Sequence, residues 1–330
     1  MRALSRSRLV WLALAVVYVA WGSTYVGMRI MDETVPPLAG AALRYLSAGL
    51  AMYGLLALRR GRAPRIAGRE LASVAVVGIL LLVGGNGLVS YAERHVPAGL
   101  AALVVASVPL WLLLLAVLTR DRPGRATLAG LATGFLGVAL LVLRGGGEHG
   151  VSIPQLLIVL GASVSWAVGS WAAARLPMPA DTAGATAIEM LIGGGVLAVL
   201  GPVTGEHWST VATSASAASL LAIAYLAVFG SILAFTAYGW LLQHAPISKV
   251  STYAYVNPVV AVALGAVLLG EQITFTTALG GAIILAAVAA VIRDEGRIAP
   301  SPAPETVPDS HAQIDKKGCT GWLAPAQGRR

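Results

Sequence analysis

Residues 18–25 read YVAWGSTY and residues 163–171 read SVSWAVGSW, and the recurrence of this motif decides the fold. Both copies contain a tryptophan, then a small residue, a hydroxyl and an aromatic ring, with Trp21 and Trp166 separated by 145 positions. An internal repeat of this length is considered before any other feature, because missing it changes the whole fold prediction.

The match continues along the chain. At the same offset of 145 positions, Arg44 matches Glu189 and Gly49 matches Gly194. At an offset of 149 positions, Pro97 matches Pro246 and Pro109 matches Pro258, and one longer loop explains the difference between the two offsets. Because the matches keep the same order in both halves, the sequence indicates two copies of one unit.

The composition predicts that both copies lie in a lipid bilayer. Of the 330 residues, 57% are hydrophobic and 12% are charged, whereas a soluble domain has about 45–50% and about 25%. Continuous apolar stretches of about 20 residues predict membrane-spanning helices, and the absence of alternation excludes barrel strands. Ten such stretches occur: 9–28, 35–58, 71–91, 98–118, 127–143, 153–173, 182–203, 217–241, 249–269 and 276–292.

Basic residues indicate the orientation. With the N-terminus in the cytoplasm, fifteen Lys and Arg residues near the ends of the spans fall inside, and three fall outside, namely Arg29, Arg94 and Arg144. For ten spans, the positive-inside rule therefore predicts that both termini are cytoplasmic. The net charge of +8 follows from this distribution and does not indicate a nucleic-acid partner.

Each copy contains five predicted spans, an odd number, so the second copy enters the bilayer from the opposite side. We expect an all-α polytopic membrane protein of ten transmembrane helices in two inverted five-helix repeats, related by a pseudo-twofold axis in the membrane plane. The first repeat covers residues 1–148 and the second covers 149–292. Residues 293–330 are rich in proline, glycine and charge, which predicts a disordered cytoplasmic tail.

Arg44 and Glu189 are equivalent charges near the middle of predicted spans. A charge at the bilayer centre costs about 2.5–3.5 kcal/mol on insertion scales, so such residues are functional candidates. Two alternatives stay open. Either the two side chains pair with each other and lock one conformation, or they face a cavity, where Arg44 contacts an anion and Glu189 contacts a cation or carries a proton.

The third predicted span carries a polar stripe. Asn86, Ser90 and Glu93 follow one another at i, i+4 and i+7, which places them on one face, directed at a partner helix or water and away from lipid. Asn86 and Ser90 are candidate substrate contacts, and Glu93 is a candidate coupling or gating residue. The alternative for Glu93, which precedes Arg94 and His95, is a solvated position at the membrane edge.

Further residues complete a candidate binding cavity between the repeats. Aromatic, hydroxyl and amide side chains on the first, sixth and ninth spans suit an amphipathic solute: Trp21, Thr24, Tyr25, Trp166, Ser170, Tyr253 and Asn257. Packing between helices is the alternative for Trp21 and Trp166. Pro109 and Pro258 lie mid-span at corresponding positions, and each predicts a kink that would let helix bundles rock around the site.

Several kinds of chemistry are missing from the sequence. It contains no phosphate-binding loop, no His-Glu-x-x-His helix and no Gly-x-Ser-x-Gly elbow. Its five histidines show no metal-ligand spacing. We therefore expect neither an enzyme nor an ATP-driven pump, and we expect no metal and no cofactor.

The two copies resemble the EamA family of the drug/metabolite transporter superfamily. The resemblance covers residues 9–292 and is carried by WGSTY at 21–25, RYLSAG at 44–49, STYAYVNP at 251–258 and Gly270-Glu271. Two further stretches, GNG at 85–87 and GATAIEML at 184–191, are most similar to the YedA-like branch. The first copy departs from the pattern, since Arg120-Asp121 stands where the second copy has Glu271.

The resemblance implies a permease or exporter in the bacterial inner membrane. It implies that spans 1–4 and 6–9 surround a central cavity while spans 5 and 10 pack away from it. It also implies amino acids, other metabolites or toxic organic compounds as substrates. It fixes neither one substrate nor a coupling ion, so proton coupling stays a hypothesis.

From the sequence we expect a secondary transporter that moves a small organic metabolite or drug-like solute by alternating access, as a multi-pass protein of the bacterial cytoplasmic (inner) membrane. Its partners are the small-molecule solute and the lipid bilayer. A homodimer is left open, and no nucleic acid is expected. The alternatives are a lipid flippase or passive channel and, more remotely, an intramembrane enzyme.

Overall fold

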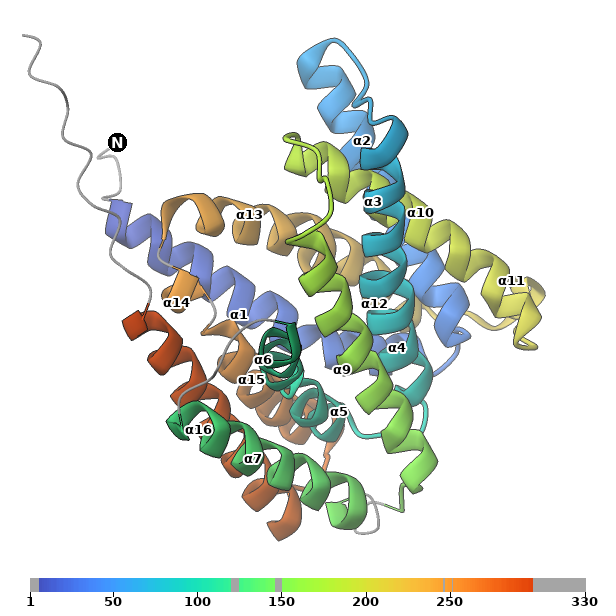
Figure 1. The fold of residues 1–330 in the computed structure, drawn as a ribbon. Coiled ribbons are helices and arrows are strands. Elements are labelled where there is room, and N and C mark those ends of the chain that lie inside the picture. The colour runs from blue at the N-terminus through green and yellow to red at the C-terminus, as the bar shows by residue number, and fades with distance from the viewer. Residues whose placement is uncertain (1–5, 120–124, 146–149, 246, 251, 299–330) are drawn as a thin grey trace, which may run out of the picture.

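The computed structural model describes residues 6–119, 125–145, 150–245, 247–250 and 252–298, and its regular structure in these ranges is helical, without strands (Figure 1). A helix pairs its backbone N–H and C=O groups within one segment, which an apolar segment in lipid requires. The long apolar segments of this chain therefore fold as helices.

Ten helical stretches follow the order of the ten predicted segments. Those of the first half are α1 (Arg6–Met31), α2 (Pro37–Arg60), α3 (Gly68–Gly78) continued by η1 (Ile79–Gly87) and α4 (Leu88–Glu93), α5 (Ala98–Val105) with α6 (Val108–Thr119), and α7 (Arg125–Leu140) with η2 (Leu141–Gly145). Those of the second half are α9 (Ile153–Ala173), α10 (Thr182–Val203), α12 (Ala217–Tyr225) continued by η3 (Leu226–Leu233) and α13 (Ala234–His244), α14 (Ile247–Val250) with α15 (Tyr253–Leu269), and α16 (Phe275–Ile298). A short helix, α11 (Trp208–Ser214), lies between α10 and α12.

The described helices confirm an all-α membrane protein with several spans. Seven stretches are long and apolar enough to cross a membrane, and three apolar helices are shorter, namely Leu128–Arg144, Tyr253–Leu269 and Phe275–Val291. Ten crossings therefore stay a prediction. The last helix continues to Ile298, beyond the expected boundary at 292, and the rest of the predicted tail, 299–330, lies outside the described residues.

α2 and α10 lie side by side and antiparallel (Figure 1). At one end, Arg60 of α2 forms an ion pair with Asp181, the residue that caps the start of α10. At the other end, Glu206 follows α10 and accepts hydrogen bonds from the first turn of α2, from the N–H groups of Leu38 at 3.2 Å and Ala39 at 3.0 Å. The end of each helix is thus bound to the beginning of the other.

α7 and α16 form a second close pair, at the lower left of Figure 1. Small residues allow this approach. A Cβ on Gly137 would lie 3.1 Å from the carbonyl oxygen of Gly280 and 2.9 Å from Cγ2 of Ile283. Close backbone contact of this kind is the usual way in which membrane helices associate without a hydrophobic driving force. Along the pair, Gly130 meets Val291 and Gly280 meets Leu141, so these helices also run antiparallel.

Two stretches are interrupted by π-helices, η1 in the third and η3 in the eighth. These stretches occupy corresponding positions in the two halves. A π-helix has i→i+5 hydrogen bonds and is rare, and it occurs frequently at functional sites. The glycines of η1, Gly84, Gly85 and Gly87, each pack against a side chain of α9 or α10. The sequence did not predict these interruptions.

The fourth stretch is broken where a kink was expected. α5 ends at Val105 and α6 begins at Val108, so Pro109 lies in the first turn of α6. There the backbone nitrogen would have no helical partner in any case, and proline is tolerated. The interruption thus lies next to Pro109, but this proline begins the second segment and does not lie inside a continuous helix. Pro258 does lie inside a helix, α15.

Candidate functional site

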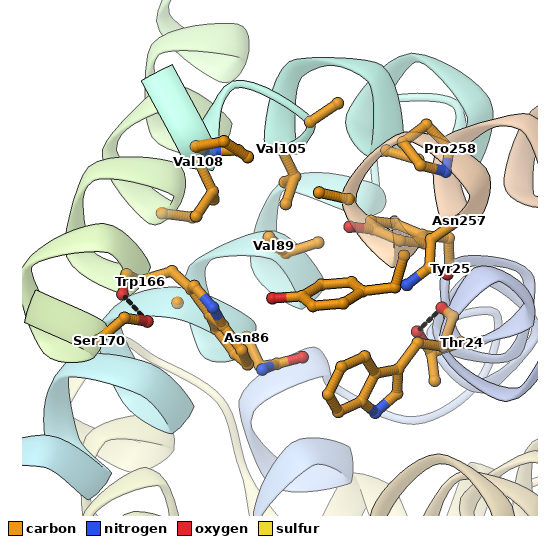
Figure 2. A pocket seen from close by; sticks show the side chains of 18 of the residues that line it. Thr24, Tyr25, Asn86, Val89, Val105, Val108, Trp166, Ser170, Asn257 and Pro258 are labelled. Carbon is orange, nitrogen blue, oxygen red and sulfur yellow. Dashed lines mark hydrogen bonds between the residues drawn. The ribbon is translucent and has the colours of Figure 1, made fainter. Parts of the chain in front are cut away.

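One cavity of about 420 Å³ lies between the two halves (Figure 2). This volume falls in the range of about 300–1,000 Å³ that small-molecule sites occupy. Eleven of the fourteen residues expected at the site line it: Trp21, Thr24, Tyr25, Arg44, Asn86, Pro109, Trp166, Ser170, Tyr253, Asn257 and Pro258. The sequence pattern therefore located the cavity, although its role as a binding site stays a prediction.

Arg44 is the one Lys, Arg, His, Asp or Glu side chain among the described residues that line the cavity. It is 3% exposed, and its Nε donates a hydrogen bond to Oγ of Ser231 in η3 at 3.1 Å. Its guanidinium lies 4.8 Å from the centre of the Tyr45 ring. The guanidinium is a positively charged group with hydrogen-bond donors only, so Arg44 places a positive charge at the cavity wall.

Aromatic rings from α1, α13 and α15 form one wall of the cavity. Trp21 lies 5.4 Å from Phe235, 5.2 Å from Tyr238 and 5.2 Å from Tyr253, measured between ring centres. The Trp21 indole Nε1 also donates a hydrogen bond of 3.1 Å to the carbonyl of Gly230 in η3. The ring contacts and this bond hold Trp21 in a single orientation.

Trp166 of α9 and Asn86 of η1 lie together on another side of the cavity (Figure 2). The Trp166 ring packs directly on Gly85, where a Cβ would come within 2.8 Å of the ring atom Cε3. Oγ of Ser165 donates a hydrogen bond of 2.7 Å to the carbonyl of Leu80 in η1. Trp21 and Ser165 thus each bond a carbonyl of a π-helix that belongs to the other half of the chain.

The two tryptophans have matching hydroxyl neighbours, drawn with dashed lines in Figure 2. Oγ1 of Thr24 donates to the carbonyl of Trp21 at 2.6 Å, and Oγ of Ser170 donates to the carbonyl of Trp166 at 2.8 Å. Each hydroxyl proton is used within its own helix. The oxygens of Thr24 and Ser170 therefore remain as acceptors at the cavity wall.

Asn257 of α15 is 8% exposed, and its amide oxygen Oδ1 has no hydrogen-bond partner in the described residues. A buried polar atom left unpaired costs about 1–3 kcal/mol. Asn257 lines the cavity, so a donor bound there can reach this side chain. Asn257 is therefore suited to accept a hydrogen bond from a bound molecule.

Residues 8–143 and, separately, residues 153–293 match the EamA-like transporter family. The chain belongs to this family. The two matched ranges fall in the two halves of the chain, on either side of the segment that joins η2 to α9.

A relative of this EamA-family protein in Escherichia coli strain K12, "Uncharacterized inner membrane transporter YedA", is 40% identical over 280 residues, which cover 84% of this chain and 89% of that protein. The protein is accordingly a multi-pass protein of the inner membrane and belongs to the YedA-like branch. A crystal structure aligns with a TM-score of 0.59 and 22% identity over 89% of this chain and 99% of that one. At this identity the likeness supports the fold alone.

Two other relatives of the EamA-family protein have names that mention a solute. The "Probable terminal-alkyne amino-acid exporter" of Streptantibioticus cattleyicolor is 29% identical over 87% of this chain and 94% of that protein. The "Probable amino-acid metabolite efflux pump" of Salmonella typhimurium is 27% identical over 84% of this chain and 92% of that protein. These names support a membrane transporter.

Three expected site residues of the EamA-family protein lie away from the cavity. Glu189 is half-buried on α10, where the helix backbone packs on Gly78 of α3. No residue of α10 is among those that line the cavity. Ser90 and Glu93 lie beyond the cavity at the end of the third stretch, and both are fully buried. The expectation of a solvated Glu93 is therefore wrong.

Arg44 and Glu189, the two charges at equivalent positions, do not pair with each other in this structure. The ion pair among the described residues of the EamA-family protein joins Arg60 and Asp181, and Arg44 has Ser231 as its hydrogen-bond partner. Arg44 thus faces the cavity and does not lock against Glu189 in this conformation. The sequence-based equivalence of the two charges did not predict that their side chains meet different surroundings.

Several residues that line the cavity of the EamA-family protein were not predicted from its sequence. Phe235 and Tyr238 on α13 face the cavity, and their i, i+3 spacing in an apolar segment was the available signal. Val291 of α16 also lines it, although the family resemblance implied that this segment packs away. No sequence signal marked Ser231 as the partner of Arg44.

Proposed function

We propose that this EamA-family protein is a secondary transporter that carries a small organic solute bearing a carboxylate and an apolar or aromatic group across the inner membrane. The observation that carries this proposal is the buried Arg44 guanidinium, the single formal charge on the described residues that line the cavity. An organic cation would meet an uncompensated like charge there, whereas a carboxylate would form a charge-assisted hydrogen bond.

The other walls suit the rest of such a solute. The aromatic wall of Trp21, Phe235, Tyr238 and Tyr253 offers apolar area for a side chain. The unpaired Oδ1 of Asn257 accepts a hydrogen bond, so an ammonium or amino group is a suitable partner for it. Carboxylate, amine and apolar group together describe an amino acid or a derivative of one, and two relatives have names that mention amino-acid export.

We further propose that transport occurs by alternating access between two inverted five-helix halves, with both termini in the cytoplasm. Equivalent helices of inverted halves run antiparallel where they meet, and both α2 with α10 and α7 with α16 do so. The π-helices η1 and η3, at corresponding positions in the two halves, supply broken helices next to the cavity, as many transporter sites do. Pro258, also at the wall, is a candidate gating residue.

A thermal-shift comparison of matched ligands tests the solute class. L-Phenylalanine and phenethylamine differ only in the carboxylate, and 3-phenylpropanoate lacks only the amine. A ligand that binds the folded state raises the apparent unfolding temperature. We expect L-phenylalanine and 3-phenylpropanoate to stabilise the protein, and we expect phenethylamine and tetraphenylphosphonium to have no effect.

Arg44→Ala should abolish the stabilisation. Arg175→Ala, which changes an exposed arginine on the loop after α9, should leave it intact. Stabilisation of the wild type by tetraphenylphosphonium alone would refute the carboxylate assignment.

Counterflow in proteoliposomes tests the mechanism. A carrier loaded with unlabelled solute transiently accumulates the labelled solute above its external concentration, whereas a passive channel only equilibrates it. Conversion of the solute without movement would indicate an intramembrane enzyme, and movement of labelled lipid without solute counterflow would indicate a flippase. Glu189→Gln is included in this assay, because the position of Glu189 in an apolar span predicted a proton carrier. An unchanged pH dependence of counterflow in this variant would exclude that role.

A further inference from the structure

Besides the exposed Glu33, four described carboxyl groups that are at least partly buried lie at the end of the molecule that contains Arg29 and Arg94, the end that the proposed orientation places outside the cytoplasm. Three of them have hydrogen-bond donors. Glu206 and Glu271 each accept two backbone N–H groups, and Asp32 accepts the hydroxyl of Ser90 at 3.4 Å. The fourth, Glu93, is 0% exposed, and neither of its carboxyl oxygens has a partner among the described residues.

A positively charged side chain, Arg29, lies close to Glu93 but does not bond its carboxyl group. The guanidinium of Arg29 donates to the backbone carbonyls of Glu93 and Arg94 and not to the carboxyl group. The groups within electrostatic range of the Glu93 carboxyl are Tyr25 and Arg29 of α1, Asp32, Arg44 of α2, and Glu271. None of them forms an ion pair or a hydrogen bond with it. An ionised carboxyl buried in this way costs several kcal/mol, so the packing accommodates the neutral acid.

Glu93 lies one helical turn beyond the cavity. Val89, four residues earlier on the same face of α4, lines the cavity, and so does Tyr25 of α1. Between the cavity and the outer end, Met28, Met31 and Val35 pack with Val89 and with the start of the eighth stretch into one buried apolar cluster. This cluster adjoins the cavity, because Met28 and Val89 belong to both. Glu93 follows Val89 by one helical turn and is itself fully buried.

We propose that Glu93 is a proton-binding site whose occupancy is linked to closure of the outer end of the cavity. The inference rests on the proposed transport function, since it concerns the cycle that alternating access requires. In the closed form Glu93 is a neutral carboxylic acid. When the outer end opens, water reaches the side chain, the O–H bond breaks, its electron pair remains on the carboxylate, and the proton passes to the outer aqueous phase. Closure takes one proton back from that phase.

A bound metal cation fits this site less well than a proton. A sodium or calcium ion needs several oxygen ligands, and no group of three His, Cys, Asp or Glu side chains in the described part of the chain is arranged to hold a metal. The carboxyl oxygens of Asp32, Glu206 and Glu271 are already occupied by protein donors. One carboxyl without partners takes a single proton.

The test measures closure directly and needs no solute. Cys319, the one cysteine in the sequence, is replaced by serine, and spin labels are placed at His95 and Ala212, two exposed positions at the outer end. Distances between the labels are measured by pulsed electron paramagnetic resonance in nanodiscs, from about pH 5 to about pH 9. We expect two populations, with the closed one increasing as the pH falls. Glu93→Gln, an uncharged analogue of the acid, should hold the closed population at every pH.

Matched variants make the outcome decisive. Glu33→Gln changes an exposed carboxyl at the same end and should keep the wild-type response. Glu93→Asp keeps a titratable group, so it should keep a response with a shifted midpoint, and it serves if the glutamine variant does not fold. A wild-type distribution that does not change with pH overturns the proposal. A response that persists in Glu93→Gln with the wild-type midpoint, or that is lost in Asp32→Asn or Glu189→Gln instead, also overturns it.

Two further comparisons separate this proposal from others. Replacing sodium by choline at constant pH should leave the populations unchanged, and a sodium-dependent shift would assign the site to a metal cation and refute proton binding. Failure of L-phenylalanine and 3-phenylpropanoate to bind or exchange, together with a pH response that requires Glu93, would refute the proposed function and support the closure linkage. Solute exchange with no pH response of the labels would support the proposed function and refute the closure linkage.

Discussion

Gly49 of α2 lies against Leu191 of α10, where a Cβ on the glycine would come within 3.0 Å of Cγ of the leucine. The contact occurs a second time with the roles exchanged, because Gly194 of α10 lies against Leu46 of α2, with a corresponding distance of 2.9 Å. Each glycine and each leucine is 145 positions from its counterpart. A twofold relation between two like surfaces produces such an exchange of contacts.

Replacing Gly194 by alanine should destabilise the protein. The new Cβ would meet both Cγ and the backbone nitrogen of Leu46 at 2.9 Å, and the backbone cannot yield as a flexible side chain would. Overpacking of this kind costs about 1–3 kcal/mol, which thermal unfolding in detergent would detect as a lower midpoint. Gly195→Ala is the control, because a Cβ at the next position of the same helix meets no atom within 4 Å. Equal midpoints for the two variants would contradict the close contact.

Glu271→Gln should lower stability through the start of α5. Oε1 of Glu271 accepts the N–H of Ala98 at 2.7 Å and Oε2 accepts that of Gly99 at 2.9 Å, so the carboxylate satisfies two unpaired donors of one helix. A glutamine offers one acceptor oxygen and no charge, which leaves one N–H unpaired at a cost of about 1–3 kcal/mol. The neighbouring exposed Gln272→Ala should have no effect on the unfolding midpoint. If both variants unfold at the wild-type temperature, the carboxylate contributes nothing to this helix.

Asp32 should make stability depend on pH. Burial raises the pKa of Asp32 well above its ordinary value, although the Ser90 hydrogen bond opposes the rise. The folded state therefore binds the proton more tightly than the unfolded chain, whose carboxyl has a pKa of about 3.9. The stabilisation is fully present below that pKa and is lost as the pH rises through the folded pKa. Asp32→Asn cannot ionise, so its unfolding midpoint should exceed that of the wild type increasingly toward neutral pH. Exposed Glu33→Gln should show no such divergence, and parallel pH curves for wild type and Asp32→Asn would exclude the effect.

Gly85→Ala should displace the Trp166 ring, since the added Cβ would lie 2.8 Å from Cε3. If Trp166 forms a wall of the binding site, L-phenylalanine should bind more weakly, by roughly tenfold for each 1.4 kcal/mol of lost contact. Titration by thermal shift measures this loss. Gly161→Ala on α9, where a Cβ meets open space, should bind normally. Unchanged affinity in Gly85→Ala would assign Trp166 to packing between helices.

Ser231→Ala should weaken carboxylate binding without removing the charge. Oγ of Ser231 accepts from Nε of Arg44 at 3.1 Å and so fixes the plane of the guanidinium. Loss of one such hydrogen bond is worth about 0.5–1.5 kcal/mol, or roughly a twofold to tenfold loss of affinity for 3-phenylpropanoate. Exposed Ser209→Ala provides the comparison in the same titration. An affinity equal to that of the wild type would show that Arg44 is oriented by other contacts.

Much of the site could be predicted because a charged or amide side chain in an apolar span is costly to expose to lipid. Arg44, Asn86 and Asn257 cannot face lipid at low cost, so their positions in the sequence already indicated the interior. Phe235 and Tyr238 were not predicted to line the cavity, because an aromatic ring can equally well face lipid, pack between helices or line a cavity. Glu189 was assigned wrongly to the cavity because equivalence in sequence fixes the depth of a residue and not the helix that its side chain meets.

The sequence by itself determined that the chain is a bundle of membrane helices, since the apolar length of each segment is a local property of the chain, and the recurrence at 145 positions predicted two related halves. Only the tertiary structure decided which polar groups find partners. Arg44 bonds Ser231, Glu206 and Glu271 bond the first turns of helices, and the Glu93 carboxyl group has no partner in the part of the chain that the structure describes. The physical reason is that hydrogen bonds and burial depend on distances between helices that are far apart in sequence, and packing of small residues sets those distances.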